Sequence, residues 1–225
     1  MGAALLLAFA LQPTGAPPDA LPETAAARLA QSLAAAEGHA THIWRDTPPF
    51  NADGTINAYV EIPRGDRRKW EYDMRRNERA IDRVMPPEVG GYPVNYGFVP
   101  QTISYDGDPF DVLVLGEPLA GGTLVRGAIV GLMHMVDDKG LDSKVVMSRV
   151  DGHGRPHGSL TSEEQRSIGK FFSRYKLHEP GEFSKVRGWG TAAEGRAFVE
   201  KTSLFFRACR TAAASPCRAS GGAMR

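Results

Sequence analysis

The chain has 225 residues, of which 42% are apolar and 24% charged, an ordinary balance for a soluble globular protein and enough for one domain with tails. The formal net charge is +1. No overall positive field therefore recruits nucleic acid or an anionic membrane surface. Basic residues nevertheless crowd residues 64–83 and acidic residues crowd 106–111 and 137–142, a segregation that suits an anionic substrate held through metal ions.

The first residues carry an apolar run from Ala3 to Leu11. It is too short to span a bilayer but has the length of a signal-peptide core, so residues 1–16 form a candidate signal for export. Two features argue against this interpretation: no Lys or Arg precedes the run, and Pro17 directly follows the candidate cleavage position. Export and a misassigned start codon both stay open.

Residues 17–42 are interpreted as a leader or linker. The stretch is first Pro-rich, and then TAAARLAQSLAAAEG predicts a helix that ends at Gly38. We assign no chemistry to it. His39 and His42 have no further ligand nearby, which favours a pair of loop residues over a zinc site.

Short apolar and β-branched runs separated by Gly, Pro and Asp begin at Ile56 and predict strands. The predicted strands cover residues 56–62, 69–73, 80–85, 111–115, 123–136 and 144–150. This pattern favours a mainly β (α+β) protein built as a small barrel or sandwich.

Two helices are predicted after the strands, each opened by a capping box. Thr161 with Glu164 opens a helix that runs to Leu177, with an apolar stripe of Ile168, Phe171, Phe172 and Tyr175. Thr191 with Glu194 opens a second helix through Phe205.

The C-terminal residues 208–225 are rich in Ala, Ser and Gly and predict a disordered tail. The tail holds both cysteines, Cys209 and Cys217. They form a small disulfide loop if the protein is exported and free thiols if it is not.

The segment DGDPFD places Asp106, Asp108 and Asp111 directly before an apolar strand. Like charges this close raise one another's pKa values, so a bound cation would stabilise them. Oxygen ligands favour Mg²⁺, Mn²⁺ or Ca²⁺ over zinc. The alternative is a solvated, Asp-rich turn.

A second acidic cluster, DDKGLDSK, lies at the end of another apolar strand and contains Asp137, Asp138, Asp142 and Lys144. Alone it fits a hairpin turn equally well. Two carboxylate clusters at neighbouring strand ends, however, can build a site for several metal ions.

Three further segments carry candidate phosphate-binding groups. In EIPRGDRRKWEYD, residues Glu61, Lys69 and Glu71 are expected on one face of a hairpin, or else the segment is a solvated basic turn. YPVNYGFVP offers the phenol of Tyr96, which packs in the core or donates a hydrogen bond to phosphate. RYK adds Lys176 at the end of the first capped helix.

Taken in chain order, the five segments EIPRGDRRKWEYD, YPVNYGFVP, DGDPFD, DDKGLDSK and RYK resemble those of the soluble, magnesium-dependent inorganic pyrophosphatases of family I. The resemblance covers residues 43–207. The resemblance implies a five-stranded OB-like β-barrel with two C-terminal α-helices packed outside. It also implies hydrolysis of pyrophosphate to two orthophosphates by in-line attack of a metal-activated water, with several Mg²⁺ ions per site and Mn²⁺ as a substitute.

The resemblance also implies the roles of individual residues. Asp108 would be the general base and Glu71 a support for the metal shell. The implied metal ligands are Asp106, Asp111, Asp137, Asp142 and Glu61, and the implied substrate-binding residues are Lys69, Arg83, Tyr96, Lys144, Tyr175 and Lys176. Two positions depart from the family: Trp70 replaces the usual Tyr, and Leu141 stands where an acid is common, which puts an accessory metal site in doubt.

The same resemblance implies a cytoplasmic homo-oligomer, a hexamer in the shorter bacterial-type enzymes, that binds no nucleic acid and does not insert stably into membranes. A protein that retains the fold but has lost the activity is the main rival, and the intact candidate ligands argue against it.

Overall fold

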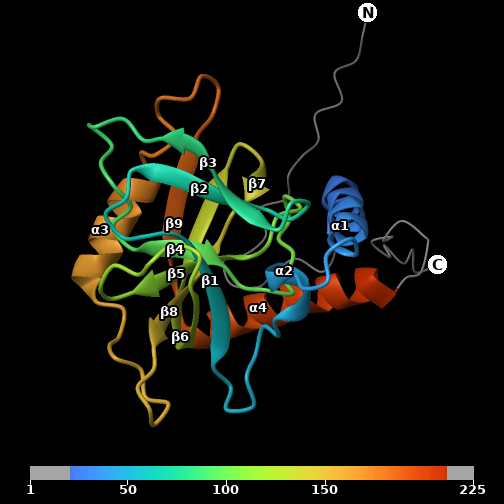
Figure 1. Ribbon diagram of the computed structural model, residues 1–225. Coiled ribbons are helices and arrows are strands. Elements are labelled where there is room, and N and C mark those ends of the chain that lie inside the picture. Colours follow the sequence, from blue (N-terminus) through green and yellow to red (C-terminus); the bar gives the residue numbers. More distant parts are fainter. Residues whose placement is uncertain (1–20, 212–225) are drawn as a thin grey trace, which may run out of the picture.

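Five strands close into a barrel in the computed structural model, which describes residues 21–211 (Figure 1). Around the ring the hydrogen-bonded order is β1 (Ile56–Ile62), β4 (Asn95–Phe98), β5 (Asp111–Leu115), β8 (Lys144–Arg149) and β6 (Leu124–Asp137). Pairing of β6 with β1 completes the ring. The predicted five-stranded, OB-like barrel is confirmed.

Within the ring, β5 and β8 run parallel and the other pairs are antiparallel. Val112 pairs with Val145, so both strands begin at the same end of the barrel. The long strand β6 also pairs with β7 (Gly140–Leu141) and β9 (Ser184–Gly190). The starts of β5 and β8 and the end of β6 thereby meet at one rim.

A separate hairpin stands beside the ring, formed by β2 (Arg68–Asp73) and β3 (Glu78–Val84). Both strands were predicted, but as part of the barrel. The expectation that Glu61 shares this hairpin with Lys69 and Glu71 is wrong, because Glu61 belongs to the barrel strand β1. Only Lys69 and Glu71, two residues apart on β2, share a face.

Helix α3 (Ser162–Phe172) begins with the predicted capping box, in which the Thr161 and Glu164 side chains each accept a hydrogen bond from the other's backbone N–H. The helix ends before the predicted Leu177. The chain continues in turns, in which the Leu177 N–H donates a hydrogen bond to the carbonyl of Arg174, three residues earlier. Tyr175 and Lys176 therefore lie in a turn after the helix.

Helix α4 (Ala192–Thr211) packs across the barrel, and helices α1 (Glu23–Ala36) and α2 (Ile43–Asp46) lie beside it (Figure 1). The α1 helix matches the prediction for the leader. Helix α4 continues past Phe205, so residues 208–211, expected in the tail, are helical.

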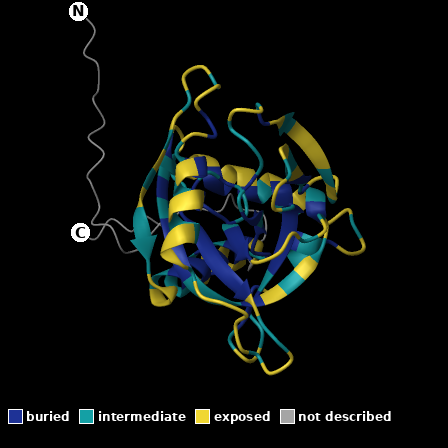
Figure 2. Ribbon diagram, turned by 90° about the vertical axis from the view of Figure 1, so that its left-hand side faces the viewer, coloured by how far each residue is buried: buried dark blue, intermediate teal, exposed yellow. Residues whose placement is uncertain are grey.

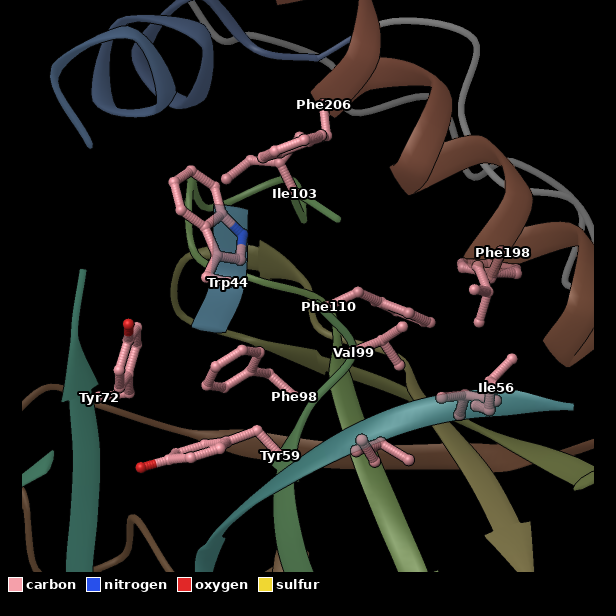
Figure 3. Packing of buried hydrophobic residues seen from close by; sticks show 14 of the residues in the cluster. Trp44, Ile56, Tyr59, Tyr72, Phe98, Val99, Ile103, Phe110, Phe198 and Phe206 are labelled. Carbon is pink, nitrogen blue, oxygen red and sulfur yellow. The ribbon is translucent and has the colours of Figure 1, made fainter. Parts of the chain in front are cut away.

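Two hydrophobic clusters fill the molecule, and Figure 2 shows the barrel strands mostly buried between exposed loops and helix faces. In the first cluster the Trp44 ring packs edge-on against Phe206 of α4, with ring centroids 5.0 Å apart (Figure 3). Leu29 of α1 is fully buried in this same cluster, so the leader helix is packed on the barrel domain. The second cluster joins the barrel to α3 through Ile168 and Phe172.

Several sequence expectations concern residues outside the described range 21–211: the signal at 1–16 and the end of the tail. Within the described range, no helix is both long and apolar enough to cross a membrane. Cys209 lies near the end of α4, and Cys217 lies beyond the described residues, so the disulfide loop and the free thiols both remain sequence expectations.

Candidate active site

A cavity of about 250 Å³ opens at the rim where β5 and β8 begin and β6 ends. Carboxylates and cations from separate elements converge on it. All of the predicted site residues except Arg83 line the cavity: Glu61, Lys69, Glu71, Tyr96, Asp106, Asp108, Asp111, Asp137, Asp142, Lys144, Tyr175 and Lys176.

Lys144 lies between two of the carboxylates, and its side chain is only 1% exposed. Its Nζ atom is 2.5 Å from Asp111 Oδ2 and 2.9 Å from Asp142 Oδ1. The rings of Tyr96 and Phe172 have centroids 5.5 and 5.6 Å from the same nitrogen. Burial works against the charged form, but the two carboxylates prevail and hold the pKa of Lys144 well above its usual range.

Burial and neighbouring carboxylates both raise the pKa values of Asp108 and Asp142. Burial, together with Asp106, raises the pKa of Asp108 to about 7, against a lowering by Arg28. Burial, together with Asp111, raises the pKa of Asp142 to about 7, although Lys144 lowers it. Added cationic charge would therefore stabilise this cluster.

Lys176 joins the second acidic cluster to the turn after α3. Its Nζ atom lies 2.8 Å from Asp137 Oδ2 and 2.8 Å from Asp138 Oδ1. Burial opposes the ammonium charge, but these two carboxylates raise the pKa of Lys176. The neighbouring Tyr175 is buried, and burial raises the pKa of its phenol, which stays a neutral hydrogen-bond donor.

The hairpin contributes Lys69 and Glu71, which form an ion pair, while Asp82 Oδ2 lies 3.1 Å from Lys69 Nζ. Glu61 faces them from β1 and accepts a 2.7 Å hydrogen bond from the Tyr72 N–H. Burial raises the pKa of Glu61 to about 8, against a lowering by the Tyr72 N–H hydrogen bond.

Arg83 does not line the cavity in this structure. It pairs across the hairpin with Lys69, but its Nη1 atom points to Glu179, 2.8 Å away. Two other nitrogens of its guanidinium, Nε and Nη2, are buried without a hydrogen-bond partner. Arg83 was expected beside the other cations of the site, but its side chain pairs with Glu179 instead.

Two cations at the cavity were missed from the sequence. Arg28, from the leader helix, donates a 2.9 Å hydrogen bond from Nη2 to Asp108 Oδ1. Nothing in the Ala-rich sequence around it signals this contact. Lys139 also lines the cavity and belongs to DDKGLD, the second acidic cluster predicted from the sequence.

The donor atoms suit a hard divalent cation. In the described part of the chain, no group of three His, Cys, Asp or Glu side chains is close enough to hold a metal ion. Lys144 and Lys176 each pair with two carboxylates of the cavity region. The carboxylate donors are nevertheless all oxygen, and Asp106 and Asp111 add to the effect of burial in raising the pKa values of Asp108 and Asp142. This chemistry fits Mg²⁺.

Comparison with known proteins gives a consistent result. The sequence model of the family "Inorganic pyrophosphatase" matches residues 58–206. An inorganic pyrophosphatase of Saccharolobus solfataricus is 37% identical over 161 residues, covering 68% of this chain and 93% of the relative. One from Rhodospirillum rubrum is 36% identical, covering 67% and 88%.

Solved structures agree. An inorganic pyrophosphatase from Coxiella burnetii superposes with a TM-score of 0.66 at 37% identity, covering 71% of this chain and 99% of that one. The enzyme from Thermus thermophilus gives a TM-score of 0.67 at 32% identity, covering 74% and 99%.

Proposed function

Because this chain belongs to the inorganic pyrophosphatase family and is a hydrolase, we propose that it cleaves pyrophosphate to two orthophosphates in a Mg²⁺-dependent reaction at the cavity described above. One observation carries the proposal: carboxylates and lysines from β1, β2, β5, β6 and β8 and from the loops beside them converge on a single cavity of about 250 Å³. Such a mixture of charges suits an anion bound through cations.

Asp106, Asp111 and Asp142 are the proposed direct metal ligands, with Asp137 and Glu61 completing the set. When bound, Mg²⁺ neutralises phosphate oxygens and acidifies water. Mn²⁺, another cation that accepts oxygen ligands, is the proposed substitute. Glu71, on the same cavity wall, supports this shell.

Asp108 is the proposed general base. Its side chain is 41% exposed and lines the cavity, so the carboxylate is accessible to a water molecule there. Burial and the charge of Asp106 raise its pKa, against a lowering by Arg28, which makes the carboxylate a stronger base than a solvated aspartate. The attacking water would approach phosphorus in line with the leaving phosphate and would pass its proton to a carboxylate oxygen of Asp108.

The remaining groups hold the phosphates. Lys69, Lys144 and Lys176 supply ammonium groups with raised pKa values that stay charged at neutral pH. Tyr96 and Tyr175 supply neutral phenols. Arg83 belongs to this set if its guanidinium turns from Glu179 toward Lys69, its cross-strand neighbour.

The direct test is phosphate release from pyrophosphate with Mg²⁺, with EDTA, and with ATP or p-nitrophenyl phosphate in place of pyrophosphate. We expect release only from pyrophosphate with added metal. Release that persists in EDTA would contradict the metal dependence. No release under any condition would favour the rival in which only the fold is retained.

We further propose that the protein is a homo-oligomer, a hexamer by analogy with the resemblance noted above, and that it acts in the cytoplasm. Light scattering at micromolar concentration tests the first statement, and a monomer mass would contradict it. Mass analysis of the native N-terminus tests the second, since cleavage after residue 16 would instead establish export.

A further inference from the structure

Helix α1 brings a guanidinium to the cavity from outside the part of the chain that matches the family. We propose that Arg28 is a substrate-positioning residue of this protein, binding a phosphate of pyrophosphate from an active-site wall that α1 forms. This inference rests on the function proposed above. Among the described cations that line the cavity, only Arg28 lies outside residues 58–206.

The position of α1 is fixed by buried apolar contacts. Ala25, Leu29 and Ala36 are all fully buried in the larger hydrophobic cluster, together with Trp44 and residues of α4. The carbonyl of Ala36 also accepts a 2.5 Å hydrogen bond from Arg45 Nη1. The helix is therefore attached to the domain over its length.

The loop that carries the acids is shaped to receive this helix. Gly107 lies between Asp106 and Asp108, and a Cβ atom added to it would lie 2.9 Å from Arg28 Cβ and 3.2 Å from Ala25 Cα. Its φ of +91° is also one that favours glycine. The absence of a side chain here lets α1 rest directly on the loop, with Ala25, Arg28 and Leu29 on one helix face.

This docking places the guanidinium against two groups of the loop. Arg28 Nη1 donates to the Asp106 carbonyl at 3.0 Å, and Nη2 donates to Asp108 Oδ1 at 2.9 Å. A guanidinium has five N–H donors, and the Arg28 side chain is 52% exposed beside the cavity. Donors are therefore left to face a second anion.

Phosphate is the anion that fits. The planar fork of N–H donors matches two phosphate oxygens, and arginine stays charged at every relevant pH. Lys69, Lys144 and Lys176 are each paired with acids of the domain. Arg28 stands at the Asp106–Asp108 side of the cavity, so it would hold the phosphate nearest the proposed base.

The experiment compares four full-length proteins: wild type, Arg28→Ala, Arg28→Lys and Gln31→Ala, the last an exposed position on the same helix. For each we would measure KM and kcat for pyrophosphate, the Mg²⁺ concentration for half-maximal activity, and calorimetric binding of methylenediphosphonate, a non-hydrolysable analogue, in the presence of Mg²⁺.

For Arg28→Ala we expect KM and the dissociation constant of the analogue to rise by about 10- to 100-fold, the scale of a hydrogen bond to a charged group. For Arg28→Lys, both values should lie between those of wild type and Arg28→Ala, since lysine keeps the charge but lacks the planar fork of N–H donors. Gln31→Ala should match wild type.

Unchanged KM and analogue binding in Arg28→Ala would overturn the proposal and leave only an ion pair on the cavity wall. Unchanged analogue binding with a lower Mg²⁺ requirement would also overturn it, because Arg28 would then compete with metal. If wild type binds the analogue but releases no phosphate, the proposed hydrolysis fails, while the titrations still decide the role of Arg28.

Discussion

The Nζ atom of Lys144 lies 2.5 Å from Asp111 Oδ2, across the parallel pairing of β8 with β5. Each residue opens its strand, immediately before the paired Val145 and Val112. The register of two barrel strands thus brings a buried cation to a carboxylate that is also a proposed metal ligand. We therefore expect a change to this pair to affect both stability and the proposed metal binding.

Lys144→Met should destabilise the metal-free protein by about 3 kcal/mol, because it leaves the half-buried carboxylates of Asp111 and Asp142 without their buried partner. Mg²⁺ should restore part of this loss by supplying positive charge to the same oxygens. Urea unfolding with and without Mg²⁺ measures both effects. Equal destabilisation in the two conditions would show that the metal does not reach these carboxylates.

The three acids of DGDPFD should behave differently when each is changed to Asn. Asp106→Asn and Asp111→Asn should raise the Mg²⁺ requirement and recover partly when metal is abundant. Asp108→Asn should lose about 10²- to 10⁴-fold in turnover, the scale of general-base catalysis, without recovery. Turnover against Mg²⁺ concentration separates the cases, and recovery of Asp108→Asn would make it another ligand.

His42 should make stability fall in acid. Its Nδ1 accepts from the Arg45 N–H at the start of α2, and its Nε2 contacts the Met74 carbonyl. Burial lowers the pKa of His42 from 6.5, and the charges of Arg45 and His39 lower it further. The Met74 carbonyl and Asp46 raise it by less. The Tyr72 hydroxyl also contacts the ring. Below about pH 6.5 the unfolded chain binds a proton that the folded protein refuses, so unfolding becomes easier.

The measurement is the urea midpoint at pH 7.5 and pH 5.5. His42→Asn keeps a capping oxygen and should lose less stability between these pH values than wild type. His153→Asn, in an exposed loop, is the matched control and should follow wild type. An identical pH response in all three proteins would remove His42 as the cause.

Gly97→Ala should destabilise the barrel by about 3 kcal/mol, the upper end for overpacking. An added Cβ would lie only 1.8 Å from the Tyr59 carbonyl oxygen, where β4 pairs with β1. Gly158→Ala is the control, since no atom lies within 4 Å of its added Cβ. Equal thermal midpoints for the two variants would mean that β1 and β4 separate at little cost.

The sequence predicted those parts of the fold and site that depend on local pattern. Apolar alternation predicted the bounds of β1, a continuous apolar run predicted those of β5, and acids beside apolar strands marked the cavity. Strand β9, SKVRGWG, was missed because its charged and Gly residues carry no strand pattern; it is a strand through its pairing with β6.

Contacts between distant segments could not be predicted. Arg28 and Asp108 are 80 positions apart, and only the docking of α1 on Gly107 brings them together. Likewise, the apolar stripe of α3 predicted a helix through Tyr175, but the chain leaves the helix at Phe172 and turns Lys176 toward Asp137. A local sequence pattern does not report the ion pair of Lys176 with Asp137, because the two residues are 39 positions apart.

The two-stranded hairpin of β2 and β3 has no ladder hydrogen bonds to the barrel ring. Moving it away from the ring breaks the hydrogen bond from the Tyr72 N–H to Glu61 but no ladder bond of the ring, so the hairpin is expected to open locally at a lower free energy than the barrel. Lys69 and Arg83 belong to the hairpin strands β2 and β3, whereas Asp111 and Lys144 belong to the barrel strands β5 and β8. A movement of the hairpin would therefore shift Lys69 and Arg83 while the spacing of Asp111 and Lys144 stays fixed.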